Sequence, residues 1–384
     1  MRIRAAVLRE YRTPLAVCEL ELDSPRAGEV LVRVAAAGVC HTDLHLADGH
    51  LGAGRHPTVL GHEGAGLVEA VGDGVDHVAP GQPVAFCFVP SCGTCAACAA
   101  GRRNLCESAA AAAWAGTLLD GTVRLRFLDG RPVLHFNFVS CFAERCVVPA
   151  ASAVPIPATL PLWQAALIGC GVVTAVGAVR NAARVGAGET VCVVGCGGVG
   201  LQLVAAARLA GAGRVIAVEP DAAKLELALA RGASDGVAAR GEAAAAGVLA
   251  LAPGGVDHAF EAVGSPATIR LAWDVLRPGA TATVVGIAPA GVEVALPALE
   301  LLSEKGIRGS YYGSGDPSAL LASMAEMAAA GSFPVADVVT HVTDLDGIGS
   351  AFDRLRSGTG ARTVAVIDAA LAGHPGARAG AVSR

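Results

Sequence analysis

The stretch from Val191 to Gly200, VCVVGCGGVG, restricts the possible folds of this chain more than any other segment. Its first four apolar residues predict a short buried strand, and a helix-forming run follows from Leu201. A strand, a tight G-x-G-x-x-G turn and a helix, in this order, favour a dinucleotide-binding fold. The predicted cofactor-contacting residues of the turn are Gly195, Gly197, Gly198, Val199 and Gly200.

Each of the three glycines of the G-x-G-x-x-G motif has a separate structural role in such a turn. Gly195 permits the turn itself, Gly197 lets the backbone approach a pyrophosphate, and Gly200 lets the helix pack close to the strand. The free N–H groups at the helix start would face the phosphates. An ordinary glycine turn in an α/β protein is the alternative.

An acidic residue supports the dinucleotide interpretation. The next apolar run, 214–218, predicts a second strand, and Glu219 follows it about twenty positions after the turn. A carboxylate there accepts hydrogen bonds from ribose hydroxyls and repels a 2′-phosphate. The sequence therefore favours NAD over NADP.

Two different sequence patterns indicate two structural parts of the chain. Residues 190–312 alternate strand-like and helix-like runs, which predicts an α/β domain with a doubly wound parallel sheet. Residues 1–35 alternate apolar and polar positions between turns, as half-buried strands do. A chain of 384 residues is long enough for two domains.

Composition excludes several classes of partner. The net charge of −5 comes without any basic run, which argues against nucleic acid. No segment approaches the roughly 18 uninterrupted apolar residues of a membrane span, and the N-terminus lacks the apolar core of a signal peptide. We therefore expect a cytoplasmic protein, in which twelve cysteines indicate metal sites and reduced thiols.

Four cysteines lie within fifteen residues of a turn-prone stretch: Cys92, Cys95, Cys98 and Cys106. Four thiolates this close can complete a tetrahedral shell around zinc and leave no position for substrate. The spacing predicts a structural zinc site, and four reduced free cysteines are the alternative.

Several motifs in order identify a resemblance. They are GVCHTDLH from Gly38, GHEGAGLVEAVGDGV from Gly61, the four-cysteine loop, IGCGVVTAVGAV from Ile168, the glycine turn with Glu219, and LRSGTGARTVAV from Leu355. From about residue 3 to 368 the chain resembles the zinc-dependent medium-chain alcohol dehydrogenases of the medium-chain dehydrogenase/reductase superfamily. The resemblance implies a Rossmann cofactor domain inserted in a β-rich, GroES-like catalytic domain.

The resemblance also implies domain boundaries. The catalytic domain would comprise 1–170 and 313–368, with a structural zinc lobe at 91–107, and the NAD-binding domain would comprise 171–312. The Ala-, Gly- and Pro-rich tail, 369–384, is expected to be disordered.

A catalytic zinc site is implied at Cys40, His62 and Cys170, each of which alone would be an ordinary buried residue. Together they leave a fourth position open for water or substrate. With the four-cysteine site, this gives an expected total of two zinc ions per subunit, one catalytic and one structural. Glu63 resembles the family's second-sphere acid, and Asp43 the carboxylate that orients His62; for both, a solvated surface charge is the alternative.

The family's proton relay and cofactor contacts carry over to matching positions. Thr42 would contact the alcohol, and His45 would be the outer relay member, reached through the cofactor ribose. Alternatively, His45 is an ordinary exposed histidine in a loop, and Lys224 is an ordinary lysine on a helix surface. The implied cofactor contacts are His41 and Arg362 near the pyrophosphate, Thr174 at the nicotinamide and Lys224 at the adenosine ribose.

The implied reaction passes a hydride between NAD(H) and a primary alcohol or aldehyde, with zinc as Lewis acid. The apolar pocket positions are Phe88, Phe136 and Phe142. Ala109 to Ala113 stand where other members of the resembled family have bulkier residues that narrow the pocket entrance. This difference predicts a wide pocket and substrates larger than ethanol.

Two other functions stay open. The thiol-adduct formaldehyde dehydrogenases share the GHEGAG and DGT segments, but their acidic residues before GHEG are replaced here by a segment that runs from His50 to Arg55. The second open function is that of a zinc-bearing binding protein that catalyses no reaction. The loop from Cys106 to Phe136 resembles the dimeric branch, so a homodimer is expected.

Overall fold

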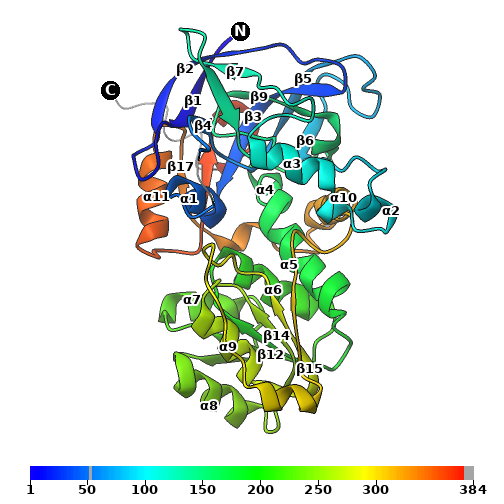
Figure 1. Cartoon of the computed structure of the whole chain (residues 1–384), viewed down its shortest axis with the longest axis vertical. Helices are drawn as coiled ribbons and strands as arrows, with labels where there is room; N and C mark the ends of the chain where they lie inside the picture. The colour runs from blue at the N-terminus through cyan, green and yellow to red at the C-terminus, as the bar shows by residue number, and fades with distance from the viewer. Residues whose placement is uncertain (52–53, 376–384) are drawn as a thin grey trace. The chain divides into compact units, whose positions relative to one another are not determined.

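The computed structural model describes residues 1–51 and 54–375. The chain divides into two compact units, shown in Figure 1. The first unit comprises Met1–Cys170 and Asp316–Arg384, and the second comprises Gly171–Gly315.

The second unit contains a six-stranded parallel sheet in the order β13-β12-β11-β14-β15-β16. Its order reverses beside the first strand of the unit, as in doubly wound dinucleotide-binding folds. The predicted parallel sheet is confirmed. The strands are β11 (Thr190–Val194), β12 (Arg214–Val218), β13 (Asp235–Val237), β14 (Val256–Glu261), β15 (Leu276–Val284) and β16 (Gly306–Gly309).

Helices cover this sheet because its strands are apolar on both faces. Residues Cys192 and Val194 of β11 join a core with residues of α8 and α9, such as Val248 and Trp273. Helix α6 packs against β11 and β12 and also contacts α5 and α7. The helices are α5 (Val173–Gly177), η4 (Ala178–Ala183), α6 (Gly198–Leu209), α7 (Ala222–Ala230), α8 (Gly241–Leu251), α9 (Pro266–Asp274) and η5 (Ala298–Ser303).

The first unit is β-rich. A closed barrel has the order β1-β2-β7-β8-β4, and a seven-stranded sheet has the order β10-β6-β5-β3-β18-β17, with β9 paired to β3. The strands are β1 (Arg2–Leu8), β2 (Ala16–Leu22), β3 (Glu29–Val39), β4 (Thr58–Val59), β5 (Glu63–Val71), β6 (Pro83–Phe86), β7 (Leu125–Arg126), β8 (Pro132–His135), β9 (Arg145–Pro149), β10 (Ala153–Pro155), β17 (Val339–Thr343) and β18 (Arg362–Val366).

Short helices connect these strands. They are α1 (His41–Ala47), α2 (Ala96–Ala99), η1 (Arg103–Leu105), α3 (Glu107–Ala115), η2 (Ala150–Ser152), α4 (Leu162–Ala165), η3 (Ile168–Val172), α10 (Pro317–Ala329), η6 (Ala336–Val338), α11 (Ile348–Arg356) and α12 (Ala369–Ala372). Helix α12 corrects the expectation of disorder from residue 369, because the Asp368 side chain accepts a hydrogen bond from the Ala370 N–H and caps the turn. Residues 376–384 of the expected tail lie outside the described residues.

One helical stretch, Leu162–Ala183, is long and apolar enough to cross a membrane by length and composition, but it is almost wholly buried inside the protein. Burial of this kind is typical of a core helix. Within this stretch, η3 is a π-helical turn that contains Cys170. Such turns insert an extra residue and often occur at functional sites.

Candidate active site

Four buried side chains of the first unit converge: Cys40, His62, Glu63 and Cys170. One ligand atom from each lies within 4.8 Å of the others. Cys40 precedes α1 at the end of β3, and Glu63 begins β5. Because Gly38 of β3 pairs with Glu63 in the antiparallel sheet, the ends of the two strands meet at one place.

Asp43 fixes the orientation of the His62 ring. Its Oδ1 lies 3.2 Å from His62 Nδ1 and accepts a hydrogen bond of 2.9 Å from the Gly61 N–H. Its Oδ2 accepts a bond of 3.3 Å from the Cys40 N–H. Asp43 is fully buried, so the alternative of a solvated surface charge is excluded.

The donor set suits zinc. Within the described part of the chain, His62 Nε2 is buried without a hydrogen-bond partner, although Nδ1 faces Asp43. A buried ring nitrogen without a partner costs free energy unless something binds it. Two sulfurs and one imidazole at this spacing form the Cys₂His set that zinc accepts with a fourth position left open.

Charges around the site favour the metal-binding form of the sulfur. The hydrogen bond between Cys40 and Cys170 holds the pKa of Cys40 well below its usual value, against the effect of burial, and His62 adds to the lowering. Burial would lower the pKa of His62, but Asp43 and Cys40 outweigh it and raise that pKa to about 10. A thiolate is therefore stabilised where a cation binds.

Glu63 is also fully buried, and it forms an ion pair with Arg362 of β18. Its other oxygen, Oε1, has no hydrogen-bond partner among the described residues and lies 3.8 Å from His62 Nε2. The surface-charge alternative is excluded here as well. The sequence did not reveal the Glu63–Arg362 pair, and the role of Arg362 at a pyrophosphate stays a prediction.

The predicted relay residues follow Cys40 on α1. The Thr42 hydroxyl lies 3.6 Å from Cys40 Sγ. His45 Nδ1 lies 3.4 Å from His50 Nδ1, and the rings of His41 and His45 are 6.4 Å apart. Partial burial, then repulsion from His41 and His50, lowers the pKa of His45, so that its neutral form dominates at pH 7.

Two of the three predicted pocket residues contact His62. The rings of Phe88 and Phe136 meet it edge to face, with centroid distances of 5.2 Å and 5.5 Å. Phe142 instead packs against Phe352 of α11, 6.2 Å away, and lies beside Gly61. The alanines 109–113 lie in α3, and the wide pocket stays a prediction.

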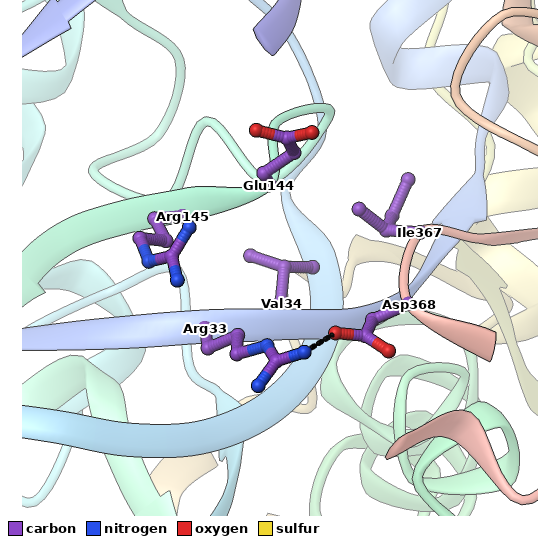
Figure 2. A pocket seen from close by; sticks show the side chains of 6 residues that line it. All are labelled: Arg33, Val34, Glu144, Arg145, Ile367 and Asp368. Carbon is purple, nitrogen blue, oxygen red and sulfur yellow. Dashed lines mark ion pairs between the residues drawn. The ribbon is translucent and has the colours of Figure 1, made fainter. Parts of the chain in front are cut away.

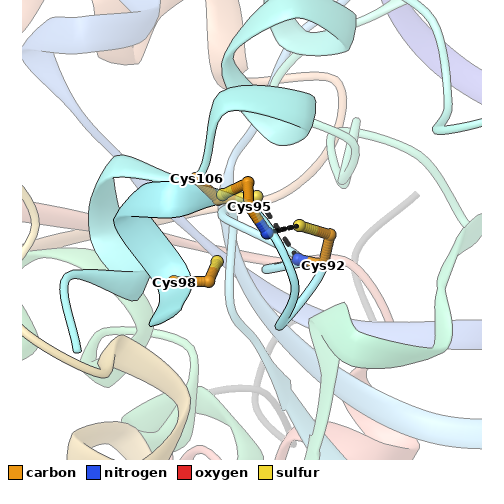
Figure 3. A group of neighbouring side chains, drawn as sticks. All are labelled: Cys92, Cys95, Cys98 and Cys106. Atoms are coloured by element: carbon orange, nitrogen blue, oxygen red, sulfur yellow. Dashed lines mark hydrogen bonds between the residues drawn. The ribbon is translucent and has the colours of Figure 1, made fainter. Parts of the chain in front are cut away.

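The four-cysteine group forms a second candidate metal centre, in which the thiol sulfurs lie within 4.8 Å of one another (Figure 3). Cys92 Sγ accepts a hydrogen bond of 3.3 Å from the Cys95 N–H, and Cys106 Sγ one of 3.3 Å from the Cys92 N–H. Hydrogen bonds from Thr94 and Cys95 lower the pKa of Cys92 to about 5. Four sulfurs and no open position fit structural zinc.

The glycine turn lies in the second unit, between β11 and α6. Gly195 has φ +91°, and a side chain at Gly200 would collide with the Gly195 carbonyl oxygen. A Cβ at Gly197 would meet nothing within 4 Å, which leaves the backbone open to a ligand. Gly198 and Val199 begin α6, where free N–H groups can bind phosphate.

The acidic residue after β12 holds this turn. Glu219 Oε2 accepts a hydrogen bond of 2.9 Å from the Cys196 N–H, and Oε1 one of 3.1 Å from the Asp221 N–H. The sequence predicted a ribose contact for Glu219 but not this bond to the turn. Lys224 lies in the first turn of α7 and Thr174 in α5, and their cofactor contacts stay predictions.

A separate cavity of about 180 Å³ in the first unit is lined by Arg33, Val34, Glu144, Arg145, Ile367 and Asp368 (Figure 2). Arg33 forms an ion pair of 2.5 Å with Asp368, and Arg145 one of 2.6 Å with Glu69. Arg33 precedes Cys40 by seven residues, which is about 20 Å along a strand. This neutralised cavity is therefore distant from the buried sulfurs.

Comparisons with known proteins agree with this geometry. Residues 26–158 match the family model for the alcohol dehydrogenase GroES-like domain, and residues 198–329 match the model for zinc-binding dehydrogenases. An S-(hydroxymethyl)glutathione dehydrogenase from Photobacterium damsela subsp. piscicida is 37% identical over 95% of this chain and 99% of that protein. The protein of the same name from Synechocystis is 36% identical over the same shares.

Solved structures are similar over nearly the whole chain. An alcohol dehydrogenase zinc-binding domain protein from Burkholderia ambifaria has a TM-score of 0.91 and 34% identity, covering 96% of this chain and 99% of that one. Benzyl alcohol dehydrogenase from Acinetobacter calcoaceticus has a TM-score of 0.90 and 30% identity, covering 96% and 100%. A dehydrogenase from Sinorhizobium meliloti, described as bound to NADP, has a TM-score of 0.79 and 28% identity, covering 95% and 99%.

Proposed function

Because the chain belongs to the zinc-dependent alcohol dehydrogenases, a family of oxidoreductases, we propose that it transfers a hydride between NAD(H) and a primary alcohol or aldehyde. The motif resemblance is thus confirmed at the level of the family. The observation that supports the proposal most strongly is that the side chains of Cys40, His62 and Cys170 lie close together in the protein interior. Nε2 of the histidine remains available to bind a metal.

The chain's own residues would prepare this reaction. Zinc held by the three side chains would supply Lewis acidity, which lowers the pKa of an alcohol hydroxyl. Asp43 keeps Nε2 of His62 aimed at the sulfurs. Thr42, whose hydroxyl lies beside Cys40, would accept the proton of the alcohol hydroxyl while giving up its own. His45, which its lowered pKa keeps neutral, would take up the released proton and pass it to water.

NAD rather than NADP is the proposed cofactor. Glu219 is buried beside the glycine turn, and a carboxylate there disfavours a 2′-phosphate. The Sinorhizobium neighbour is described with NADP. We expect catalytic efficiency to be higher with NAD, and Glu219→Ala to reduce that preference.

Aromatic alcohols are the proposed substrate class. Phe88 and Phe136 place apolar aromatic rings against the His62 ring, and the Acinetobacter neighbour is named for benzyl alcohol. The test is a panel of primary, allylic and benzylic alcohols with NAD and zinc, followed by NADH formation. No turnover with any of them would oppose the proposal and favour a zinc-bearing binding protein.

A second candidate is the oxidation of a thiol–formaldehyde adduct, since the relatives named above are S-(hydroxymethyl)glutathione dehydrogenases. It requires that activity with formaldehyde depend strictly on an added thiol. Formaldehyde-dependent NADH formation with and without glutathione distinguishes the two candidates.

A further inference from the structure

Helix α1 ends in a turn that brings His50 back to His45. Gly49 lies in the left-handed region, with φ +77°. Its N–H donates a hydrogen bond of 2.9 Å to the Leu46 carbonyl oxygen, and the His50 N–H donates one of 2.8 Å to the His45 carbonyl oxygen. These two bonds define a Schellman motif, in which the residue after the glycine contacts a residue of the last helical turn. The contact is commonly apolar, but here it joins two histidines.

The two imidazole rings face each other through one nitrogen each. His45 Nδ1 lies 3.4 Å from His50 Nδ1, and the ring centroids are 5.7 Å apart. The centroid distance equals the nitrogen separation plus one ring radius on each side, so both nitrogens lie on the line between the rings. When one Nδ1 carries a proton and the other does not, the pair forms a straight N–H···N path.

This path leads from the metal site to the surface. The Thr42 hydroxyl lies 3.6 Å from Cys40 Sγ, and His45 follows Thr42 by three residues on α1, on the same face of the helix. His45 is half-buried, whereas His50 is exposed to solvent. A proton that reaches His45 therefore has an imidazole acceptor between it and the water at the surface.

The charged groups around His45 keep its ring neutral. Burial, then repulsion from His41 and His50, lowers the pKa of His45, whereas Cys40 and Asp48 act in the opposite direction. Asp48 is itself neutralised by an ion pair of 2.9 Å with Arg356 of α11, and its carbonyl oxygen accepts a hydrogen bond from Arg12. A neutral imidazole has one donor and one acceptor nitrogen, as proton transfer through a ring requires.

We propose that His50 is the last proton acceptor of the relay and links His45 to water. A proton that arrives on Nε2 of His45 lets Nδ1 of that ring give its own proton to Nδ1 of His50. The N–H bond on His45 breaks as the one on His50 forms, and His50 then releases a proton from Nε2 to water. The inference rests on the proposed function, in which alcohol oxidation releases one proton for each hydride transferred.

The test follows proton release by stopped flow with phenol red, after the enzyme is mixed with NAD and benzyl alcohol in dilute buffer. His50→Leu keeps an apolar contact that the Schellman motif favours but cannot accept a proton. His50→Gln can form hydrogen bonds but does not become protonated. In both variants we expect proton release to slow by up to about 100-fold. Added imidazole should restore the rate, because it replaces the lost acceptor.

His77→Gln is the matched control, because His77 is an exposed histidine of the same unit whose Nε2 lies 3.1 Å from the Ala150 carbonyl oxygen of η2. It should release protons at the wild-type rate. Wild-type rates in both His50 variants, or slow release that imidazole does not restore, would overturn the proposal.

Nitrogen NMR of the histidine rings tests the pair without turnover. If no alcohol is oxidised, the proposed function fails, but the contact between the two rings can still be measured. His50→Leu removes a repulsion, so the pKa of His45 should rise relative to the wild type. An unchanged pKa of His45 in His50→Leu would show that the rings do not share a proton path and would refute the role of His50.

Discussion

At the scale of single residues, the site depends on side chains that do not themselves bind the metal. Asp43 is fully buried and bonds to the ring of His62 and to two backbone N–H groups, those of Cys40 and Gly61. A carboxylate behind a metal-binding imidazole fixes its orientation and makes it a stronger ligand.

Asp43→Asn should therefore weaken zinc binding at this site by about 10- to 100-fold. Zinc affinity can be measured by competition with a chelating dye, and kcat/KM should fall with it. Asp346→Asn is the control, because Asp346 lies at the surface and pairs with Arg4 alone among the described residues. Equal zinc affinity in Asp43→Asn and the wild type would contradict the assignment.

His135 gives the stability a defined pH dependence. It is buried, its Nε2 accepts a hydrogen bond from the Arg124 N–H, and burial followed by repulsion from Arg124 lowers its pKa to about 3. The unfolded chain binds this proton near pH 6.5, so the stabilisation is present above pH 6.5 and is lost as pH falls towards 3.

The expected loss across that window is at most about 5 kcal/mol of unfolding free energy. Urea unfolding at several pH values measures it, and His135→Gln should flatten the pH dependence relative to the wild type. Parallel curves for the two proteins would show that His135 titrates normally in the folded state.

At the scale of elements, strand ends and one turn position the chemistry. The sequence predicted the strand–turn–helix unit because its glycines, apolar run and following acid are local signals. It did not reveal the Glu63–Arg362 pair, because β5 and β18 are far apart in sequence and meet only through β3. It did not reveal the π-helical turn at Cys170 either, because such a turn has no distinct residue pattern.

Two alanine substitutions in the glycine turn should have different effects. Gly200→Ala would drive a Cβ into the Gly195 carbonyl oxygen and should destabilise the fold by about 2 kcal/mol or more. Gly197→Ala has open space, so stability should be kept while NAD binds more weakly. Thermal unfolding and NAD titration test both, and unchanged NAD affinity in Gly197→Ala would argue against a pyrophosphate at this turn.

At the scale of the whole molecule, the second unit has an exposed apolar segment. Leu299 and Leu302 of η5 are 78% and 82% exposed, and β16 is an edge strand of the sheet. Exposed apolar patches and unpaired edges both favour association. The homodimer inferred from the family resemblance stays a prediction. The surface formed by η5 and β16 is its candidate interface.

Leu302→Asp should shift the protein from dimer to monomer in sedimentation velocity, because a charge would have to be desolvated at the interface. Glu242→Gln, at the start of α8, is a surface control that should not change the oligomeric state. A wild-type protein that sediments as a monomer at all concentrations would remove the basis for the dimer.

The central claim is that Cys40, His62 and Cys170 hold a zinc ion that the reaction requires, separate from the four-cysteine centre. The most direct measurement is the zinc content and NAD-dependent turnover of Cys170→Ala beside the wild type. We expect two zinc ions per chain in the wild type, one in the variant, an unchanged circular dichroism spectrum and no measurable turnover. A variant that kept both ions, or full activity, would contradict the account.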